Sequence, residues 1–169
     1  GWGVVGKTLG VLLFVVGVAL AWGGLQGNTD PLRPLGRTAA ERAPAFETLA
    51  SYDALRQRLG ARAPGSPPVV LDLYADWCIA CKVMERSIFP APPVAQALSR
   101  FERWRLDLTA NTAQDRALLA DYGLFGPPAL LFFDSQGQEL KAYRLQGEPT
   151  VDSLGRHLQA VLSAAPEGE

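Results

Sequence analysis

The sequence predicts an α/β domain, with a central mixed sheet flanked by helices, preceded by one apolar helix and a linker. Three observations lead to this fold class. An apolar, β-prone run at Val69–Tyr74 leads into two cysteines, Cys78 and Cys81. Strand and helix patterns then alternate along the rest of the chain. Residues 1–25 are almost wholly apolar, and a segment rich in glycine and proline follows them.

Residues 1–25 predict a transmembrane helix, because about twenty consecutive apolar residues can cross a bilayer. They hold one charged side chain, Lys7, and Trp2 and Trp22 stand near the two ends, where interfacial aromatic residues are expected. The alternative is a cleaved signal peptide with a small-x-small site at 19–21. The chain does not begin with Met, which indicates a piece of a longer protein and favours the retained helix.

Residues 26–45 predict a flexible linker, because glycine and proline recur there without any sustained periodicity. Residues 46–165 then predict one domain. The whole chain carries sixteen basic and seventeen acidic side chains, and its arginines are scattered. Neither property is typical of a nucleic-acid-binding surface, so we expect no nucleic acid among its partners.

The first half of the domain is expected to hold one strand among short helices. Ser51 can cap a helix that runs through Leu59. Val69–Tyr74 is apolar nearly throughout, as a strand covered by helices on both faces should be. The exception is Asp72. A buried carboxyl group there destabilises the fold unless it has hydrogen-bonding or charged partners, or serves the function of the protein. A helix from Cys78 to about Ser87 and a short helix at Val94–Leu98 follow.

The second half alternates strands with helices by the same criteria of apolar spacing and turn residues. The expected elements are a strand around Trp104–Leu108, a helix at Thr112–Tyr122, a buried strand at Ala129–Phe133, a hairpin turn at Ser135–Gln138, a strand at Glu139–Leu145 and a helix at Thr150–Leu162. From the central strand onward, the order is therefore β, α, β, α, β, β, α.

A strand that ends in a C-x-x-C pair opening a helix is the arrangement of thioredoxin-type redox proteins. At a helix N-terminus, unpaired N–H groups and the helix dipole favour an anion, so Cys78 should ionise more readily than a free cysteine. Cys81 lies one turn further and can close a disulfide with it. We therefore expect Cys78 to attack and Cys81 to resolve.

Other readings of the cysteine pair are weaker. Zinc usually takes four Cys or His ligands, whereas this chain holds two cysteines and one histidine, His157, so no metal site is expected. A purely structural disulfide would close a very small loop and gain little chain entropy. A binding module with incidental cysteines would not require the intact Trp77-Cys-x-x-Cys motif.

Several motifs in the same order resemble the C-terminal periplasmic thioredoxin-like domain of the DsbD family of bacterial thiol:disulfide interchange proteins. They are DLYADWCIACK at 72–82, DLTAN at 107–111, GPP at 126–128, and LFFD at 131–134 followed by GQE at 137–139. The resemblance covers roughly Phe46 to Leu162 and implies a thioredoxin fold.

The resemblance also implies a protein-disulfide reductase that relays electrons from a membrane-embedded domain to periplasmic partners. Its redox group would be the Cys78–Cys81 disulfide, with no other cofactor, and its electrons would come from cytoplasmic thioredoxin and NADPH through the membrane domain. Expected partners are the membrane domain and the N-terminal periplasmic domain of a longer protein, periplasmic thiol-disulfide proteins and membrane lipid. The protein would sit in the bacterial inner membrane, with this domain facing the periplasm.

Two alternatives to this function stay open. One is a stand-alone, membrane-tethered thioredoxin-like protein that serves one client, such as cytochrome c maturation. The other is an oxidase, since the direction of exchange depends on reduction potential. The two residues between the cysteines, Ile79 and Ala80, include no histidine, and this favours reduction.

Two carboxylates are expected beside the cysteines. Asp72 belongs to the strand that leads to them, and Glu85 lies seven residues after Cys78, two helical turns on. A nearby carboxylate raises the pKa of a thiol, and it can also move protons during exchange. The family resemblance assigns this acidic pair to tuning the active-site cysteines.

The resemblance also places a partner-binding surface around the cysteines. Trp77, Ile79 and Ala80 belong to the motif itself, and Pro128 stands where the family has a cis-proline. The residue before that proline ordinarily offers a backbone N–H and C=O to a partner segment. Here it is Pro127, which has no N–H, so only the carbonyl remains for docking.

Overall fold

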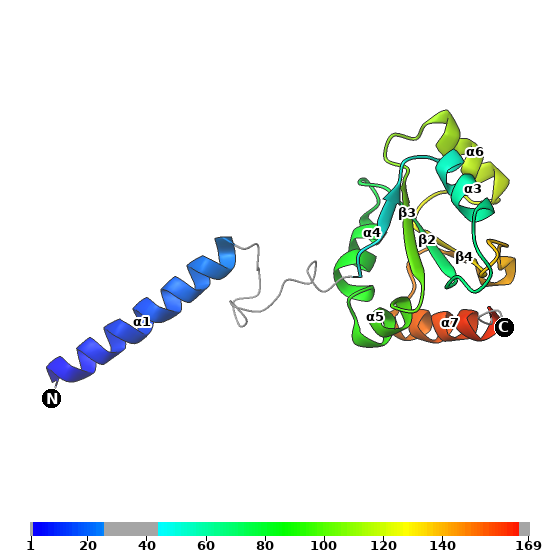
Figure 1. Cartoon of the computed structure of the whole chain (residues 1–169). Helices are drawn as coiled ribbons and strands as arrows, with labels where there is room; N and C mark the ends of the chain where they lie inside the picture. Colours follow the sequence, from blue (N-terminus) through cyan, green and yellow to red (C-terminus); the bar gives the residue numbers. More distant parts are fainter. Residues whose placement is uncertain (1, 26–43, 166–169) are drawn as a thin grey trace. The chain divides into compact units, whose positions relative to one another are not determined.

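The computed structural model describes residues 2–25 and 44–165 of the 169-residue chain (Figure 1). The chain divides into two compact units, Gly1–Arg42 and Ala43–Glu169, which are considered separately below. The boundary falls within the linker expected at 26–45. Most of that linker lies outside the described residues, so its flexibility stays a prediction.

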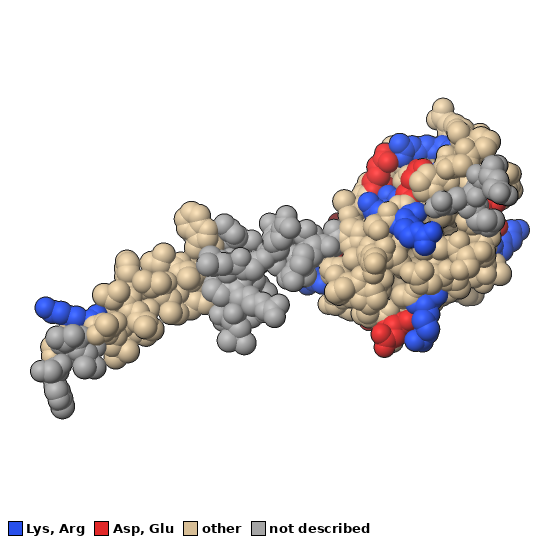
Figure 2. Space-filling view, turned by 60° about the horizontal axis from the view of Figure 1, so that its bottom comes forward, with Lys and Arg blue, Asp and Glu red and all other residues tan. Residues whose placement is uncertain are grey.

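The first unit contains one helix, α1 (Trp2–Leu25), among its described residues. Between Leu9 and Trp22, its large apolar side chains are exposed around the whole helix. In Figure 2 the described residues of the helix are tan apart from a blue side chain, and the sequence of the helix holds one charged residue, Lys7. Among the described residues, no helix is both long and apolar enough to cross a membrane. The transmembrane helix expected at 1–25 therefore stays a prediction.

The second unit is built on a mixed sheet, as the sequence predicts. Its strands are β1 (Glu47–Leu49), β2 (Val69–Tyr74), β3 (Glu102–Asp107), β4 (Ala129–Phe133) and β5 (Leu145–Gln146). They lie in the order β1-β3-β2-β4-β5. The first three in this order are parallel, whereas β4 and β5 run antiparallel to their neighbours. The apolar strand that leads to the cysteines is thus the central strand.

Helices cover both faces of the sheet (Figure 1). One face carries α3 (Tyr52–Gly60) and α6 (Ala113–Asp121). The other carries α4 (Ile79–Val83), the π-helical turn η1 (Met84–Ile88), α5 (Pro92–Leu98) and α7 (Val151–Ala164). Side chains of Ser51, Thr112 and Thr150 cap α3, α6 and α7 by accepting backbone N–H groups.

The central strand β2 is buried along its whole length and alternates between two apolar cores. Val69, Leu71 and Leu73 enter the core under α3 and α6. Val70 enters the core under α5 and α7. Because successive strand residues point to opposite faces, Asp72 lies on the same face as Val70, which is the face covered by α4 and η1.

The structure corrects the expected elements in three places. The edge strand β1 is absent from the sequence-based prediction, because three residues are too few to show an alternation. The helix that follows the cysteines ends at Ile88, close to the expected Ser87, but its last part is the π-helical turn η1. The strand expected at 139–145 is wrong for most of its length. Glu139 forms only an isolated bridge, 141–143 form a 3-10 turn (η2), and pairing resumes at β5.

Candidate active site

Cys78 and Cys81 form a disulfide at the start of α4, with an S–S distance of 2.06 Å. Cys78 is the N-cap residue of α4, and its Sγ atom accepts a hydrogen bond from the Cys81 N–H at 3.1 Å. This N–H donor points at the sulfur on which a thiolate would form in the reduced protein. Such a donor stabilises the anion and lowers the pKa of a thiol.

Solvent access differs little between the two sulfurs in this oxidised state. Cys78 is 5% exposed and Cys81 is 2% exposed. The expectation that Cys78 attacks therefore rests on its place at the helix start and not on exposure. Neighbouring motif residues are far more open, because Trp77 is 60% exposed, Ile79 is 80% exposed and Ala80 is half-buried.

Phe125 is a further candidate site residue, which is not among those expected from the sequence. Its side chain is 94% exposed. It precedes Gly126 and the cis peptide bond between Pro127 and Pro128. Antiparallel pairing of β2 with β4, in register at Leu73 and Ala129, brings this turn to the end of β2 that leads into the cysteines.

We call the exposed side chains of Trp77, Ile79 and Phe125 the apolar rim. Together with Val83, these are the exposed large apolar side chains in the described part of the domain. They occur in two segments that the sheet register brings to the same end of β2. Exposed apolar side chains gathered at one place mark an interaction site more often than scattered ones do.

The loop after β3 holds the approach to the cysteines in place. Thr109 Oγ1 accepts a hydrogen bond from the Asp76 N–H at 2.8 Å, and the Thr109 carbonyl accepts one from Trp77 Nε1 at 3.3 Å. The Thr109 N–H in turn donates to Asp107 Oδ1 at 2.9 Å. The DLTAN motif at 107–111 therefore fixes the backbone just before Cys78.

The structure brings Asp72 and Glu85 together through a third residue, Arg105 of β3. Arg105 Nε and Nη2 bind Asp72 Oδ2 at 2.9 and 2.8 Å, while Nη1 binds Glu85 Oε1 at 2.9 Å. From the sequence, Arg105 is expected only as part of the strand around Trp104–Leu108, with no role in the site. The signal was a buried aspartate in the central strand, which needs a cationic partner.

Aromatic rings connect this ion network to the cysteines. The Arg105 guanidinium carbon lies 4.4 Å from the centroid of the Tyr74 ring and 5.4 Å from that of the Phe46 ring. Tyr74 packs in one buried cluster with Ala75 and both cysteines. The acidic pair therefore lies behind Tyr74, one layer of side chains away from the disulfide cluster.

Burial raises the pKa of Asp72 from its ordinary value of 3.8 to about 6. The charge and hydrogen bonds of Arg105 oppose this effect, and the nearby Glu85 carboxylate adds to it. The Asp72 side chain is only 3% exposed, so burial dominates even beside a cation. Asp72 can therefore gain and lose a proton close to neutral pH.

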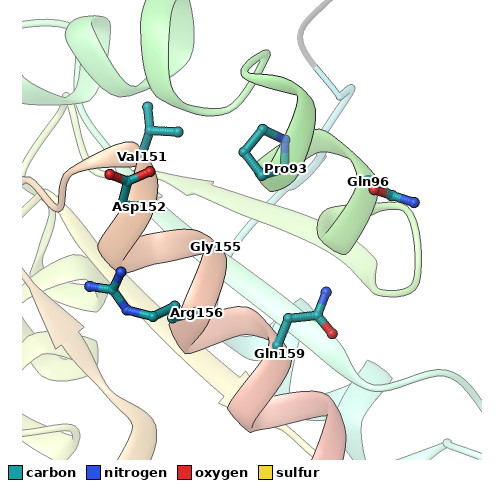
Figure 3. A pocket seen from close by; sticks show the side chains of 7 residues that line it. All are labelled: Pro93, Gln96, Val151, Asp152, Gly155, Arg156 and Gln159. Atoms are coloured by element: carbon teal, nitrogen blue, oxygen red, sulfur yellow. The ribbon is translucent and has the colours of Figure 1, made fainter.

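A groove of about 440 Å³ lies between α5 and α7, at a different place from the cysteines. Pro93 and Gln96 of α5 and Asp152, Arg156 and Gln159 of α7 are among the residues that line it (Figure 3). A Cβ atom on Gly155 of α7 would lie 3.8 Å from Pro93 Cβ, which is an ordinary van der Waals distance, so the helix packing here does not require glycine. The lining contains no cysteine and takes no part in the chemistry described here.

Across residues 2–25 and 44–165, no group of three or more His, Cys, Asp or Glu side chains is arranged to hold a metal ion. The chemistry that the described residues can perform is thiol–disulfide exchange at Cys78 and Cys81. Its parts are a sulfur held at a helix start, a buried carboxylate that titrates near neutrality, and an exposed apolar rim.

Comparison with known proteins agrees with this arrangement. Residues 51–135 match the thioredoxin-like family. The thiol:disulfide interchange protein DsbD of Ralstonia nicotianae is 39% identical over 168 residues, which cover 95% of this chain and 28% of that protein. DsbD 1 of Pseudomonas aeruginosa is 37% identical over 160 residues, which cover 90% of this chain and 27% of that protein. The chain thus spans little more than a quarter of the length of these relatives.

A solved structure gives the same result. The crystal structure of the oxidised C-terminal domain of Neisseria meningitidis DsbD is 36% identical and superimposes with a TM-score of 0.55. The match covers 98% of that domain and 69% of this chain. The chain therefore belongs to the thioredoxin-like family, and its cysteine-bearing domain is a thiol:disulfide oxidoreductase domain of the DsbD C-terminal type.

Proposed function

We propose that this domain is the electron-donating arm of a longer, membrane-bound protein-disulfide reductase. It accepts two electrons from a membrane-embedded part of that protein and reduces disulfides of periplasmic proteins. The observation that carries the proposal is the cysteine pair at the start of α4, with Cys78 Sγ held by the Cys81 N–H and exposed apolar side chains beside it. No metal or organic cofactor is required, because the reduced Cys78–Cys81 dithiol itself carries the two electrons and becomes a disulfide when it donates them.

The reaction proceeds by two exchange steps. The Cys78 thiolate attacks one sulfur of the partner disulfide, the partner S–S bond breaks, and the released partner thiolate takes up a proton. Cys81 then loses its proton and attacks Cys78 Sγ. The Cys78–Cys81 bond forms, the mixed disulfide breaks, and the second partner thiolate takes up a proton. Overall, one dithiol becomes a disulfide and one partner disulfide becomes a dithiol, with two electrons and two protons transferred.

Asp72 and Glu85 tune this exchange under the proposal. Their negative charges oppose a second negative charge on Cys78 and so raise the pKa of its thiol. The position of Arg105 between them supports a shared role, because it ties the strand residue and the helix residue into one charged unit. Tyr74, which contacts both this unit and the cysteine cluster, is the layer through which the charges act.

The partner protein docks on the apolar rim. Trp77, Ile79 and Phe125 offer apolar surface, and Ala80 lies between the two cysteines at the same edge. An extended partner segment can also donate an N–H to the carbonyl of Pro127, which is half-buried beside the cis bond to Pro128. Pro127 and Pro128 thus contribute a backbone hydrogen-bond acceptor to the docking surface.

Under the same proposal, the domain is anchored at the inner membrane through helix α1. Support comes from its composition: apolar side chains occupy all sides of the helix and are exposed, as expected for a helix in contact with lipid. Expression of the chain in a Gram-negative bacterium, followed by a carbonate wash of the membranes, tests this part. Retention in the washed pellet supports it, and release into the supernatant contradicts it.

The direction of electron flow is tested with the chain kept in mild detergent. The cysteine pair is reduced with dithiothreitol, the reagent is removed, and an oxidised disulfide-bonded test protein is added. We expect the test protein to gain two thiols for each Cys78–Cys81 disulfide formed. A test protein that stays oxidised while the chain stays reduced would contradict the proposed reductase.

A further inference from the structure

Arg105 makes a contact pattern that a lysine could not reproduce. Three of its nitrogens serve two carboxylates from different elements, with Asp72 on β2 and Glu85 on η1. The planar guanidinium presents several N–H donors at fixed angles, whereas an ammonium is a single point charge. The π-helical turn contributes to this geometry, because it widens the helix at 84–88, where Glu85 reaches the sheet.

This network is more deeply buried than a surface ion pair. The side chains of Asp72, Arg105 and Glu85 are 3%, 14% and 38% exposed. Tyr74 and Phe46 place their rings over the guanidinium. An ionised carboxylate as buried as Asp72 is costly unless a cation pairs with it.

Among the groups described around Asp72, Arg105 is the cation that pairs with its carboxylate. On the β4 side its neighbour in register is Leu130, which is apolar. Glu85 of η1 is an anion and disfavours an ionised Asp72. Further along β2 stands Tyr74, and α4 contributes the two cysteines behind it. Lys82 of α4 contacts the Tyr74 hydroxyl and Asp76.

We propose that Arg105 is a positioning residue for the exchange reaction, which keeps Asp72 ionised so that Asp72 can take up the proton of Cys81. The inference rests on the proposed function, because it concerns the second exchange step. In that step the Cys81 proton passes to an Asp72 oxygen through water, because the Tyr74 layer separates the two groups, and the Cys81 thiolate attacks Cys78 Sγ. The leaving thiolate is then protonated from solvent, and Asp72 returns its proton to solvent.

Without Arg105, burial and the Glu85 charge would both favour a neutral Asp72, and a neutral carboxyl group cannot accept the proton. An opposite charge at hydrogen-bond distance shifts the pKa of a carboxyl group by about 1–3 units. Arg105→Gln should therefore move the titration of Asp72 upward by at least about one unit. The resolving step would then need a correspondingly higher pH.

The test measures the resolving step alone, in the whole chain kept in detergent. Oxidised glutathione forms a mixed disulfide at Cys78, and the release of glutathione by Cys81 is followed from pH 5 to pH 9. We expect Arg105→Gln to move the acid limb of this profile upward, because a one-unit shift of the Asp72 pKa from about 6 lowers its ionised fraction about tenfold at pH 5 and about twofold at pH 7. Release should slow by these factors. Arg105→Lys keeps the charge but loses the planar fork of donors, so it should shift the acid limb less than Arg105→Gln does. Arg86→Gln removes an exposed cation from the same turn and should match the unchanged chain.

A second readout does not depend on catalysis. In the oxidised chain, the pH dependence of the unfolding free energy reports the titration of Asp72, and Arg105→Gln should extend it above pH 6. An unshifted glutathione profile in a folded Arg105→Gln chain would overturn the inference, and so would equal losses in Arg105→Lys and Arg105→Gln. A shifted profile in a chain that does not reduce protein disulfides would overturn the proposed function and leave the role of Arg105 standing.

Discussion

Asp72 and Arg105 are direct partners in the parallel register of β2 and β3, and two guanidinium nitrogens bind the same Asp72 oxygen at 2.8 and 2.9 Å. This pair places a charged group inside a strand that is otherwise apolar, directly behind the tyrosine that packs on the cysteines. The pair therefore links the stability of the domain to the ionisation of its redox site.

The first prediction concerns stability and pH in the oxidised chain. The folded-state pKa of Asp72 is about 6, above the ordinary value of 3.8, so between these values the folded state holds a proton that the unfolded state has lost. The contribution of Asp72 to the unfolding free energy should thus fall as pH rises from about 4 to about 6, by at most about 3 kcal/mol. Above about pH 6, the contribution of Asp72 to the unfolding free energy should no longer change with pH.

Urea unfolding at a series of pH values measures this effect as the difference between the unchanged chain and Asp72→Asn. Asp152→Asn, which removes an exposed carboxylate from the first turn of α7, is the matched control. If Asp72→Asn has the same pH dependence as the unchanged chain, Asp72 does not titrate in this window.

The second prediction concerns the reduced chain. Asp72→Asn combined with Glu85→Gln should lower the pKa of the Cys78 thiol, because two anions are removed and the Arg105 cation loses its carboxylate partners. We expect a shift of about one unit or more. Thiolate absorbance measured against pH gives the value, with circular dichroism to confirm that the double variant is folded.

Asp72→Asn and Glu85→Gln should each produce a smaller shift of the thiol pKa than the double variant does. An unchanged or raised thiol pKa in a folded double variant would show that the carboxylates do not act on Cys78. The acidic pair would then have a structural role only.

The third prediction concerns Phe125. Phe125→Ala removes an exposed ring from the apolar rim and touches no part of the core. It should raise the KM for a protein disulfide by about tenfold, since the loss of one interface aromatic residue costs on the order of 1–2 kcal/mol. The rate with a small disulfide such as hydroxyethyl disulfide should not change, because a small disulfide does not reach the rim.

Steady-state kinetics with both substrates provide this comparison. Leu9→Ala, which truncates an exposed apolar residue on α1 in the other unit, is a control of similar chemistry. Equal effects of Phe125→Ala on the protein and the small substrate would argue against a docking role.

Much of the fold could be predicted from the sequence, because its signals are local. Continuous apolar runs mark β2 and β4, and alternation marks β3. Threonines that can cap a helix mark the starts of α6 and α7. The strand expected at 139–145 failed for a non-local reason. Arg144 binds Glu139 and the Tyr122 carbonyl and draws the chain away from β4 until Leu145.

The candidate site was predictable where a motif carries it and not where contacts between strands create it. Cys78 and Cys81 follow from their spacing and from the strand before them. Arg105 is 33 residues from Asp72 in the sequence, and their pairing depends on the register of β3 against β2. Phe125 is a single apolar residue in a turn, and only its exposure in the fold separates it from a core residue.

The most direct test of the whole account is the identity of the cysteine that attacks. Cys81→Ala leaves Cys78 able to attack a partner disulfide but removes the thiol that resolves the product. We expect this variant to accumulate mixed disulfides through Cys78, identified by mass spectrometry of non-reduced complexes, while Cys78→Ala accumulates none. Mixed disulfides that form through Cys81 in Cys78→Ala, with none in Cys81→Ala, would contradict the account.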